Sequence, residues 1–246
     1  MNQPVYLRTW GDFACFTRPE MKVERVSYQV MTPSAARGIL EAILYRPQFR
    51  WQVRRIAVKK PVRFLAFRRN EVKSKLSVRN PEPLLADEDR TQRNTLALRD
   101  VEYVIEATLV TTALAGERRK PAVHEDDKGP DSSFKYLSMF ERRAAKGQCF
   151  TQPVFGCREF PAYFELANAS AMISPQSANP DGPLGLMLYD VFDLDVSKDQ
   201  PLGPTQKQQP RISFFKAAMK KDILIGEGQD ALPSWASMKQ QQGGAP

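Results

Sequence analysis

The chain has 246 residues, of which 42% are hydrophobic and 26% are charged, and these fractions exclude wholesale disorder. A chain of this length buries a core large enough to fold without disulfides, while the absence of any run of about 18 apolar residues or of an apolar leader excludes a membrane span and a secretory signal. The 36 basic residues outnumber the 28 acidic ones, and the resulting net charge of +8 favours a polyanionic partner, most simply a nucleic acid, while the odd count of three cysteines fits free thiols in a reducing cytoplasm.

The first predicted elements are extended segments. Apolar and polar residues alternate over residues 5–10, which predicts a strand. Gly11-Asp12 is a turn or bulge signal, after which residues 13–16 resume extended structure. A further alternation over residues 26–30 predicts another short extended piece.

A helix is predicted to begin after Thr32. The Thr32 hydroxyl can cap the helix, and Pro33 suits the first helical position. Because Pro47 restricts the residue before it, we expect the helix to end near Tyr45. The apolar stripe of this helix consists of Ile39, Ala42 and Ile43.

Strands are predicted on both sides of a turn at Lys59-Lys60-Pro61. Residues 51–58 and 62–67 have the composition of strands. Residues 79–95 are polar and contain prolines, so they are predicted to form a loop. Residues 101–111 are rich in β-branched side chains, which predicts a further strand.

A charged loop over residues 115–131 leads to a second predicted helix. Ser132 or Ser133 caps this helix, which runs to about Lys146 and stops at Gly147. Its buried stripe consists of Leu137, Phe140 and Ala144, with Phe134 near its start.

The last part of the chain is predicted to be extended. Residues 157–166 predict a strand, in which Pro161 indicates an edge position or a bulge. A segment rich in Asn, Ser and Pro follows over residues 168–183. Residues 184–192 and 212–225 then predict strands separated by a loop rich in Gln and Pro.

The order strand, helix, strands, helix, strand predicts an α+β fold. It matches the β-α-β-β-α-β pattern of ferredoxin-like (RRM-like) domains with an extra hairpin. We therefore expect such a domain over residues 1–166, with a sheet face of the kind that binds RNA. Residues 167–246 are predicted to form a small β-rich C-terminal domain with a flexible tail.

Positive charge is concentrated in residues 50–79, which we call the basic segment. It holds eleven basic residues and one acidic residue, with Trp51, Phe64 and Phe67 interleaved. Arginine forks and aromatic rings suit phosphates and stacked bases, although a solvated strand face is the alternative. The nearly single sign of charge favours nucleic-acid contact. The candidate RNA-binding residues are Arg37, Arg54, Arg55, Arg68, Arg69, Lys73, Lys75, Arg142, Arg143 and Arg158.

RNA cleavage without a metal needs few protein groups. The ribose 2′-OH is the nucleophile, a base removes its proton, a cation offsets the charge that builds on the phosphate, and an acid protonates the leaving 5′-oxygen. The sequence has no obvious carboxylate cluster, and its three cysteines form no CxxC pair. We therefore expect no metal and no cofactor.

Candidate catalytic residues lie at the two predicted helices. Tyr45 could act as base or acid if cations lowered its pKa from about 10, although its position alone favours an aromatic that closes the helix end over the core. Lys135 and Arg142 project from one face of the second helix, where they grip a phosphate or form an ordinary solvated face. Tyr136 and Arg143 form the neighbouring row.

The single histidine, His124, excludes any scheme that needs two imidazoles from one chain. The three acidic residues after it favour its protonated form, and it is either catalytic or a surface residue of an acidic loop. Arg68, Arg69 and Arg158 have glutamates close by in the sequence. They therefore either bind phosphate or form ion pairs.

Three segments of the chain resemble the Cas5d type of CRISPR-associated protein, from type I-C systems and the RAMP superfamily. They are "FTRPEMKVERVSYQVMTPSAARGILEAILYRP" (16–47), "FRRNEVKSK" (67–75) and "MFERRAAKGQCFTQPVFGCREF" (139–160). The resemblance implies a ferredoxin-like N-terminal domain and a β-rich C-terminal one. It also implies metal-independent cleavage of precursor CRISPR RNA within the repeat hairpin. The protein would then hold the 5′ handle in a Cascade-like complex with other type I-C subunits.

The resemblance implies a catalytic set as well. The family has a Tyr at the end of the first helix and a Lys-His pair four and three positions before the "MF" of the second helix. These positions are Tyr45, Lys135 and Tyr136 here, so a tyrosine stands where the family has the group best suited to proton transfer near neutral pH. Either Tyr136 replaces that histidine as acid or base, or His124 reaches in from its loop.

Two other functions are compatible with the sequence. The first is a binding subunit without catalysis, which caps the 5′ end of the guide RNA, and the missing histidine favours it. The second is general duplex binding, DNA included, through the same cations.

Overall fold

The structure is a computed structural model that describes residues 3–74, 85, 87–112, 115, 132–174, 177–191, 212–235 and 237–238. These residues form two α-helices, α1 (Pro33–Ile43) and α2 (Ser133–Ala145), and one antiparallel sheet of eight strands. The strands are β1 (Val5–Ala14), β2 (Phe49–Val58), β3 (Phe64–Val72), β4 (Arg90–Thr111), β5 (Tyr163–Ala167), β6 (Gly182–Asp190), β7 (Ser213–Lys220) and β8 (Ile223–Gly226). The fold therefore combines helices with an antiparallel sheet, which confirms the mixed α and β content that the sequence predicts. Lys75, His124 and the C-terminal tail lie outside the described residues.

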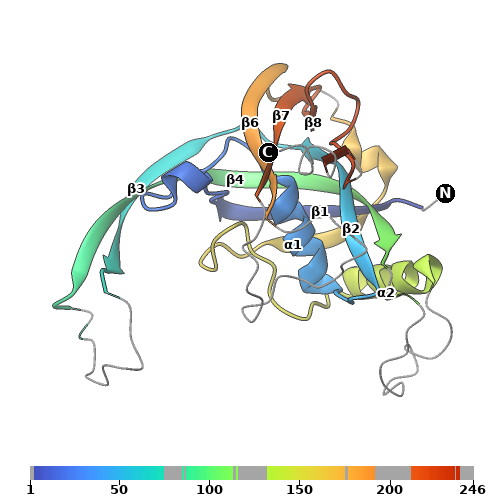
Figure 1. Cartoon of the computed structure of the whole chain (residues 1–246), viewed down its shortest axis with the longest axis horizontal. Coiled ribbons are helices and arrows are strands. Elements are labelled where there is room, and N and C mark those ends of the chain that lie inside the picture. Colours follow the sequence, from blue (N-terminus) through green and yellow to red (C-terminus); the bar gives the residue numbers. More distant parts are fainter. Residues whose placement is uncertain are drawn as a thin grey trace, which may run out of the picture.

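The strands follow the order β5-β1-β4-β2-β8-β7-β6, and β3 pairs with β4 outside that path (Figure 1). β4 has 22 residues, so its second half pairs with β1 and β2 while its first half pairs with β3. The β3–β4 hairpin consequently projects away from the helices (Figure 1).

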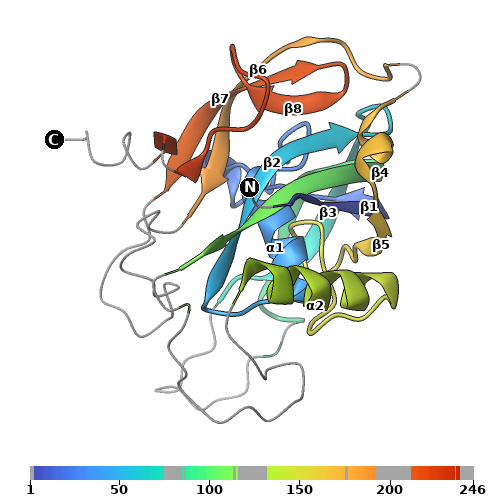
Figure 2. The ribbon, with the colours of Figure 1, turned by 90° about the vertical axis from the view of Figure 1, so that its right-hand side faces the viewer.

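Both helices contribute to one hydrophobic core on the sheet (Figure 2). Leu7 on β1 faces Ile105 on β4, and both are fully buried with Leu40 of α1 and Phe140 of α2. Alternate residues of β1 and of the second half of β4 therefore turn toward the helices, and the others turn toward the opposite face.

The first predicted helix is confirmed as α1. The Thr32 hydroxyl accepts a hydrogen bond from the amide of Ala35 at 3.2 Å, and Pro33 occupies the first turn. The helix ends at Ile43, two residues before the expected end, because Leu44 adopts an extended conformation with φ −146°. Tyr45 therefore belongs to the segment that leads into β2.

The second predicted helix is confirmed as α2. The Ser132 hydroxyl accepts a hydrogen bond from the amide of Lys135 at 3.2 Å, which caps the first turn. The helix ends at Ala145, and Gly147 follows with φ +64°, the left-handed conformation that glycine adopts readily after a helix.

Two breaks that the sequence predicted between strands, a loop that includes residues 90–95 and a turn or bulge at Gly11-Asp12, were wrong because tertiary contacts override local signals. Residues 90–95, predicted as loop, begin β4, since their backbone pairs with β3. β1 runs through Gly11 without the predicted bulge, as Gly11 pairs with Val101 in register. A Cβ at Gly11 would lie 2.8 Å from the Pro161 carbonyl, so glycine serves close packing here and not a turn.

Two further predictions placed strands where the chain turns. Of residues 157–166, the last four belong to β5, which begins at Tyr163. Residues 212–225 divide into β7 and β8 at Lys221 and Asp222, which have φ values of +51° and +60°. Positive φ at both residues is typical of a two-residue hairpin turn. The Asp222 carboxylate, which is buried, stabilises this turn by accepting bonds from the amides of Ala178 and Asn179, both at 2.8 Å.

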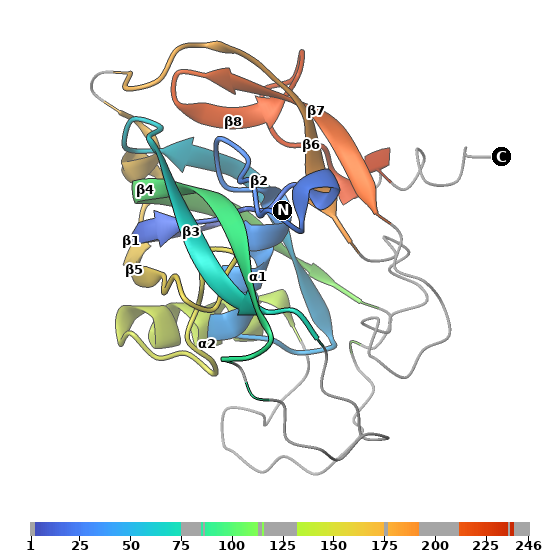
Figure 3. The ribbon, with the colours of Figure 1, turned by 90° about the vertical axis from the view of Figure 1, so that its left-hand side faces the viewer.

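β8 pairs with β2, so the strands after residue 167 extend the same sheet (Figure 3). The Arg37 guanidinium of α1 adds a second link by bonding both carboxylate oxygens of Asp190 on β6. The division of the chain at residues 166 and 167 stays a prediction. None of the helices in the described part of the chain is long and apolar enough to cross a membrane.

Candidate active site and nucleic-acid interface

The first candidate catalytic residue, Tyr45, lies just after α1, and its side chain is 42% exposed. The carbonyl of its neighbour, Leu44, accepts a hydrogen bond from the indole nitrogen of Trp51 at 3.1 Å. This bond fixes the backbone next to Tyr45 onto the start of β2, and the phenol ring of Tyr45 is left at the surface.

The second candidate, Lys135, lies in the first turn of α2. Its amide is held by the Ser132 cap, and its ammonium lies 5.8 Å from the centre of the Tyr136 ring. A cation at this distance from a ring face is attracted by the ring. The geometry therefore places Lys135 against the ring of its neighbour.

The third candidate, Tyr136, belongs to the core. Its side chain is 2% exposed, and its ring packs 4.8 Å from that of Phe49. Phe49 in turn contacts Trp51 at 5.4 Å, and Trp51 contacts Phe140 at 4.7 Å. Tyr136 thus joins an aromatic cluster formed by Phe49, Trp51, Tyr136 and Phe140.

The aromatic cluster brings the two candidate regions together. Trp51 holds the carbonyl next to Tyr45, while Tyr136 contacts the ammonium of Lys135. A second connection runs from α2 to α1, because the Arg143 guanidinium donates to the carbonyl of Ile43 at 3.1 Å. The end of α1 and the helix that carries Lys135 are therefore held against each other.

The aromatic residues of the basic segment divide into buried and accessible ones. Trp51 is 1% exposed, so the expectation that it stacks on bases was wrong. The alternation of β2 turns Phe49, Trp51 and Val53 toward the helices, where their burial stabilises the core. Phe64 is 42% exposed and Phe67 is half-buried, both on β3.

Three of the candidate RNA-binding arginines form ion pairs with carboxylates. Arg37 bonds Asp190 at 2.8 and 3.0 Å and Glu41 at 2.6 Å. Although burial opposes the charge of Arg37, these two carboxylates raise its pKa. Arg55 bonds Glu106, and that hydrogen bond raises the pKa of Arg55.

Arg69 is the third. It bonds Glu71 and Glu159 at 2.6 Å each, and Arg25 lies 3.0 Å from the same Glu71 oxygen. The pKa of Glu159 is lowered by its own backbone amide and by the charges of Arg69 and Arg25. The sequence left open whether Arg69 pairs with glutamate, and the structure shows that it does.

Other candidate cations lie on exposed surfaces. Arg68 is exposed on β3, Lys73 follows the end of that strand, and Arg158 lies in the turn before β5; no ion pair engages these three within the described part of the chain. Arg142 is exposed in the last turn of α2, and Arg54 is half-buried on β2. The exposed candidate cations therefore lie on the projecting hairpin, on α2 and in the turn before β5.

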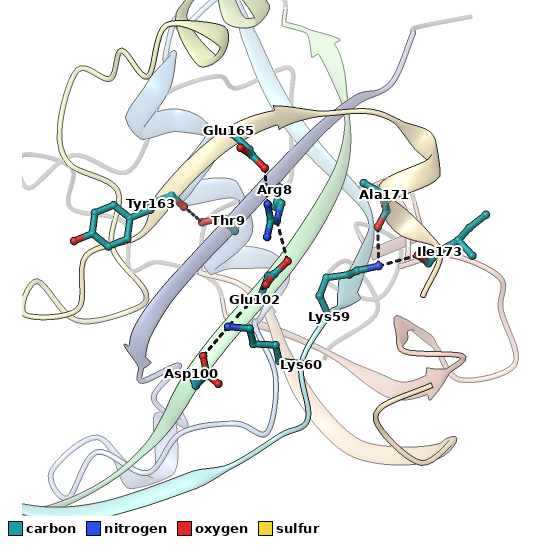
Figure 4. Close-up of polar contacts among 10 residues, drawn as sticks. All are labelled: Arg8, Thr9, Lys59, Lys60, Asp100, Glu102, Tyr163, Glu165, Ala171 and Ile173. Carbon is teal, nitrogen blue, oxygen red and sulfur yellow. Dashed lines mark hydrogen bonds and ion pairs between the residues drawn. The ribbon is translucent and has the colours of Figure 1, made fainter. Parts of the chain in front are cut away.

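The sheet face opposite the helices carries an ion-pair network that the sequence did not predict (Figure 4). Arg8 bonds Glu102 at 2.8 Å and Glu165 at 2.7 Å. The ammonium of Lys60 bonds Asp100 at 2.6 Å. The acidic residues neutralise the basic ones, which makes this face a poor general attractor for phosphates.

Lys59, also on that side, is bound to backbone carbonyls. Its ammonium donates to the carbonyls of Ala171 and Ile173 at 2.9 Å each (Figure 4). Burial lowers the pKa of Lys59. These bonds fix the segment after β5. Although Lys59 belongs to the basic segment, its ammonium therefore binds the protein's own backbone.

No group of three or more His, Cys, Asp and Glu side chains in the described ranges is arranged to hold a metal ion. The three cysteines, Cys15, Cys149 and Cys157, are free thiols. Cys157 lies 3.6 Å from the Arg25 guanidinium, at the edge of the Arg69 network.

Comparison with known proteins confirms the family resemblance. The family described as CRISPR-associated protein (Cas_Cas5), of the Cas5d type, matches residues 5–224. A relative in Mannheimia succiniciproducens named CRISPR pre-crRNA endoribonuclease Cas5d is 45% identical over 240 residues, covering 91% of this chain and 95% of its own. A Thermus thermophilus protein of the same name is 44% identical over 194 residues, covering 78% of this chain and 74% of its own.

Solved structures share the fold. A functionally uncharacterized protein, SMU1763c from Streptococcus mutans, aligns with a TM-score of 0.59 and 20% identity, covering 97% of this chain and 96% of that one. A CRISPR-associated protein aligns with a TM-score of 0.57 and 22% identity, covering 93% and 95%. The family match and the relatives' identities over most of the chain lead to one conclusion: this chain belongs to the Cas5d family of CRISPR-associated proteins.

Proposed function

We propose that this chain is an endoribonuclease that cuts precursor CRISPR RNA within the repeat hairpin by a metal-independent mechanism. The observation that carries the proposal is that one aromatic cluster contacts both the backbone next to Tyr45 and the ammonium of Lys135, in a chain about 45% identical to two proteins named pre-crRNA endoribonucleases. A phenol supplies a proton-transfer group and an ammonium supplies a positive charge, which are the groups that 2′-OH attack on a phosphodiester needs.

In this mechanism the RNA provides the nucleophile. The 2′-oxygen loses its proton and bonds to phosphorus, while the bond from phosphorus to the 5′-oxygen breaks. Tyr45 either accepts the proton from the 2′-oxygen or donates the proton that the leaving 5′-oxygen takes up, solvent water serves the other transfer, and the Lys135 ammonium offsets the charge on the phosphate oxygens. The products are a 2′,3′-cyclic phosphate and a 5′-hydroxyl.

Tyr136 assists by supporting Lys135. Its ring is buried against Phe49 and lies beneath the Lys135 ammonium, 5.8 Å from ring centre to nitrogen. This contact supports a role for the ring in aiming Lys135 at the scissile phosphate. Arg68, Lys73, Arg142 and Arg158 supply exposed positive charge for the RNA backbone.

We infer a ferredoxin-like core for the N-terminal part. Its support is the antiparallel order β5-β1-β4-β2, with α1 between β1 and β2 and α2 between β4 and β5. We further propose that the protein acts in the cytoplasm and keeps the 5′ handle of the product in a Cascade-like complex with other subunits.

The proposal is tested with labelled cognate repeat RNA and purified protein in EDTA. Cleavage at one position within the hairpin, leaving a 2′,3′-cyclic phosphate and a 5′-hydroxyl, is the expected result. Products with a 3′-hydroxyl, or cleavage that EDTA abolishes, would contradict the mechanism.

A second candidate function is a binding subunit that caps the guide RNA without cutting it. The tyrosine at position 136, where the family pattern has histidine, favours it. Tight repeat binding with no product at high protein concentration would select this function. Steep salt dependence with equal affinity for unrelated duplexes, DNA included, would instead indicate general duplex binding.

A further inference from the structure

The C-terminal end of α1 is held by groups from outside the helix. The last carbonyls of any α-helix lack partners within it. Here the Ala42 carbonyl accepts from the amides of Phe150 at 2.8 Å and Thr151 at 3.3 Å, and the Ile43 carbonyl accepts from the Arg143 guanidinium at 3.1 Å. The carbonyls that end α1 are therefore satisfied by α2 and by the chain that follows it.

Arg143 is the side-chain member of this set. It is half-buried in the last turn of α2, and its neighbour Arg142 is exposed. The Arg143 cation lies at the negative end of the α1 dipole, which favours a positive charge. The bond to Ile43 uses one terminal nitrogen of Arg143, Nη1, and holds the guanidinium against the end of α1.

The bond joins the two halves of the candidate active site. Ile43 precedes Tyr45 by two residues, and Arg143 belongs to the same helix as Lys135. We propose that Arg143 is a positioning residue that sets Tyr45 relative to Lys135, and that it is not a phosphate ligand. This inference rests on the proposed function, because it assigns Arg143 a task in that same site.

The test separates RNA binding from the cleavage step. Arg143→Met keeps the alkyl stem and removes the donor. We expect the single-turnover rate at saturating protein to fall about 10- to 100-fold, since small displacements of reacting groups have effects of this size. The dissociation constant for a repeat RNA with a 2′-deoxy scissile nucleotide, and its salt dependence, should match wild type.

Arg143→Lys provides a rescue variant. A lysine ammonium can donate to a carbonyl, although from one nitrogen, so we expect it to recover part of the lost rate. The Arg143→Lys variant also replaces Arg143→Met in the rate measurement if Arg143→Met folds poorly. Ile225→Val, which trims a buried residue of β8, reports whether a modest loss of thermal stability alone slows cleavage, and Glu141→Gln reports the effect of an exposed change on α2.

Arg142→Met is the comparison for a phosphate contact. We expect weaker RNA binding and a slope of log K against log salt reduced by about 0.7 to 0.9. If Arg143→Met shows that same pattern with a wild-type rate at saturation, Arg143 is a phosphate ligand and the inference is wrong.

A measurement without RNA keeps the inference independent of catalysis. Loss of the Arg143 bond should speed hydrogen exchange of the amides of residues 44–46 relative to wild type. If wild-type protein fails to cut the repeat, the proposed function fails. Hydrogen exchange at residues 44–46 then tests only the claim that Arg143 holds the backbone leading to Tyr45. Unchanged exchange in Arg143→Met would overturn that claim.

Discussion

Arginines that look equivalent in the sequence differ in what their guanidinium groups contact. Arg69 bonds two glutamates and Arg55 bonds one, whereas Arg68 projects from β3 into solvent. A cation that already neutralises a carboxylate offers less to a phosphate, because binding RNA would leave the carboxylate unpaired. The local count of charges in the basic segment therefore overstates its attraction for RNA.

At the residue scale, the catalytic assignment predicts how two substitutions act. Lys135→Met should lower the single-turnover cleavage rate about 10²- to 10³-fold, the usual effect of removing one group that stabilises transition-state charge. Tyr45→Phe, which removes only the hydroxyl, should lower the rate about 10²-fold or more. Rates are measured in EDTA with repeat RNA. Wild-type rates in both variants would show that the site lies elsewhere.

Gly11 gives a prediction about packing. Gly11→Ala places a Cβ 2.8 Å from the Pro161 carbonyl and 2.9 Å from the Phe155 ring, so we expect a loss of about 1–3 kcal/mol in the free energy of unfolding. Gly38→Ala, in α1, is the matched control. Nothing lies within 4 Å of its added Cβ, and we expect a gain of about 0.5–1 kcal/mol. Urea denaturation measures both, and equal effects would contradict the packing argument.

At the element scale, the β3–β4 hairpin combines strand pairing with exposed charge. Its two strands pair over nine residues, from Phe64 with Leu98 to Val72 with Arg90. Arg68 and Lys73 project from it without ion pairs among the described residues. An element that extends from the body in this way is suited to reach along an RNA backbone.

This element yields a prediction on salt dependence. Arg68→Gln with Lys73→Gln should weaken repeat-RNA binding and reduce the slope of log K against log salt by about 1.4 to 1.8 if both cations contact phosphates. The control removes two charges from β7, Lys216→Gln with Lys220→Gln, and should leave the slope near that of wild type. Equal slopes for the two double variants would remove the hairpin from the RNA interface.

At the scale of the whole molecule, the C-terminal strands and the helical layer are tied together. β8 continues the sheet from β2, and the Arg37–Asp190 pair joins α1 to β6. The Asp190 side chain is 4% exposed and that of Arg37 is 19% exposed, so solvent screens the pair weakly.

Arg37→Met and Asp190→Asn each break this pair while leaving the partner with little solvent access. We expect each to lower the free energy of unfolding by about 3 kcal/mol. The double variant should lose less than the sum of the single losses, because the Asp190 carboxylate is no longer left buried opposite a methionine, while Glu41 loses the Arg37 cation equally in the single and the double variant. Denaturation of all four proteins measures the coupling, and strict additivity would mean that the bond contributes nothing to stability.

Local signals in the sequence determined the helices and much of the sheet. The Thr32-Pro33 start, the Ser132 cap and the Gly147 stop predicted both helices to within two residues, because caps are made by side chains next to the backbone that they satisfy. The three family segments identified the Cas5d family. The same segments and the net charge pointed to RNA as the partner before any contact was known.

Tertiary structure alone decided the rest. The first residues of β4 are strand because β3 pairs with them, and Trp51 is buried because α2 covers its side of the sheet. Arg143 bonds a helix end, and Arg69 bonds glutamates from two segments. These outcomes depend on groups that are distant in the chain and meet only on folding, so neither periodicity nor the spacing of charges in the sequence contains them.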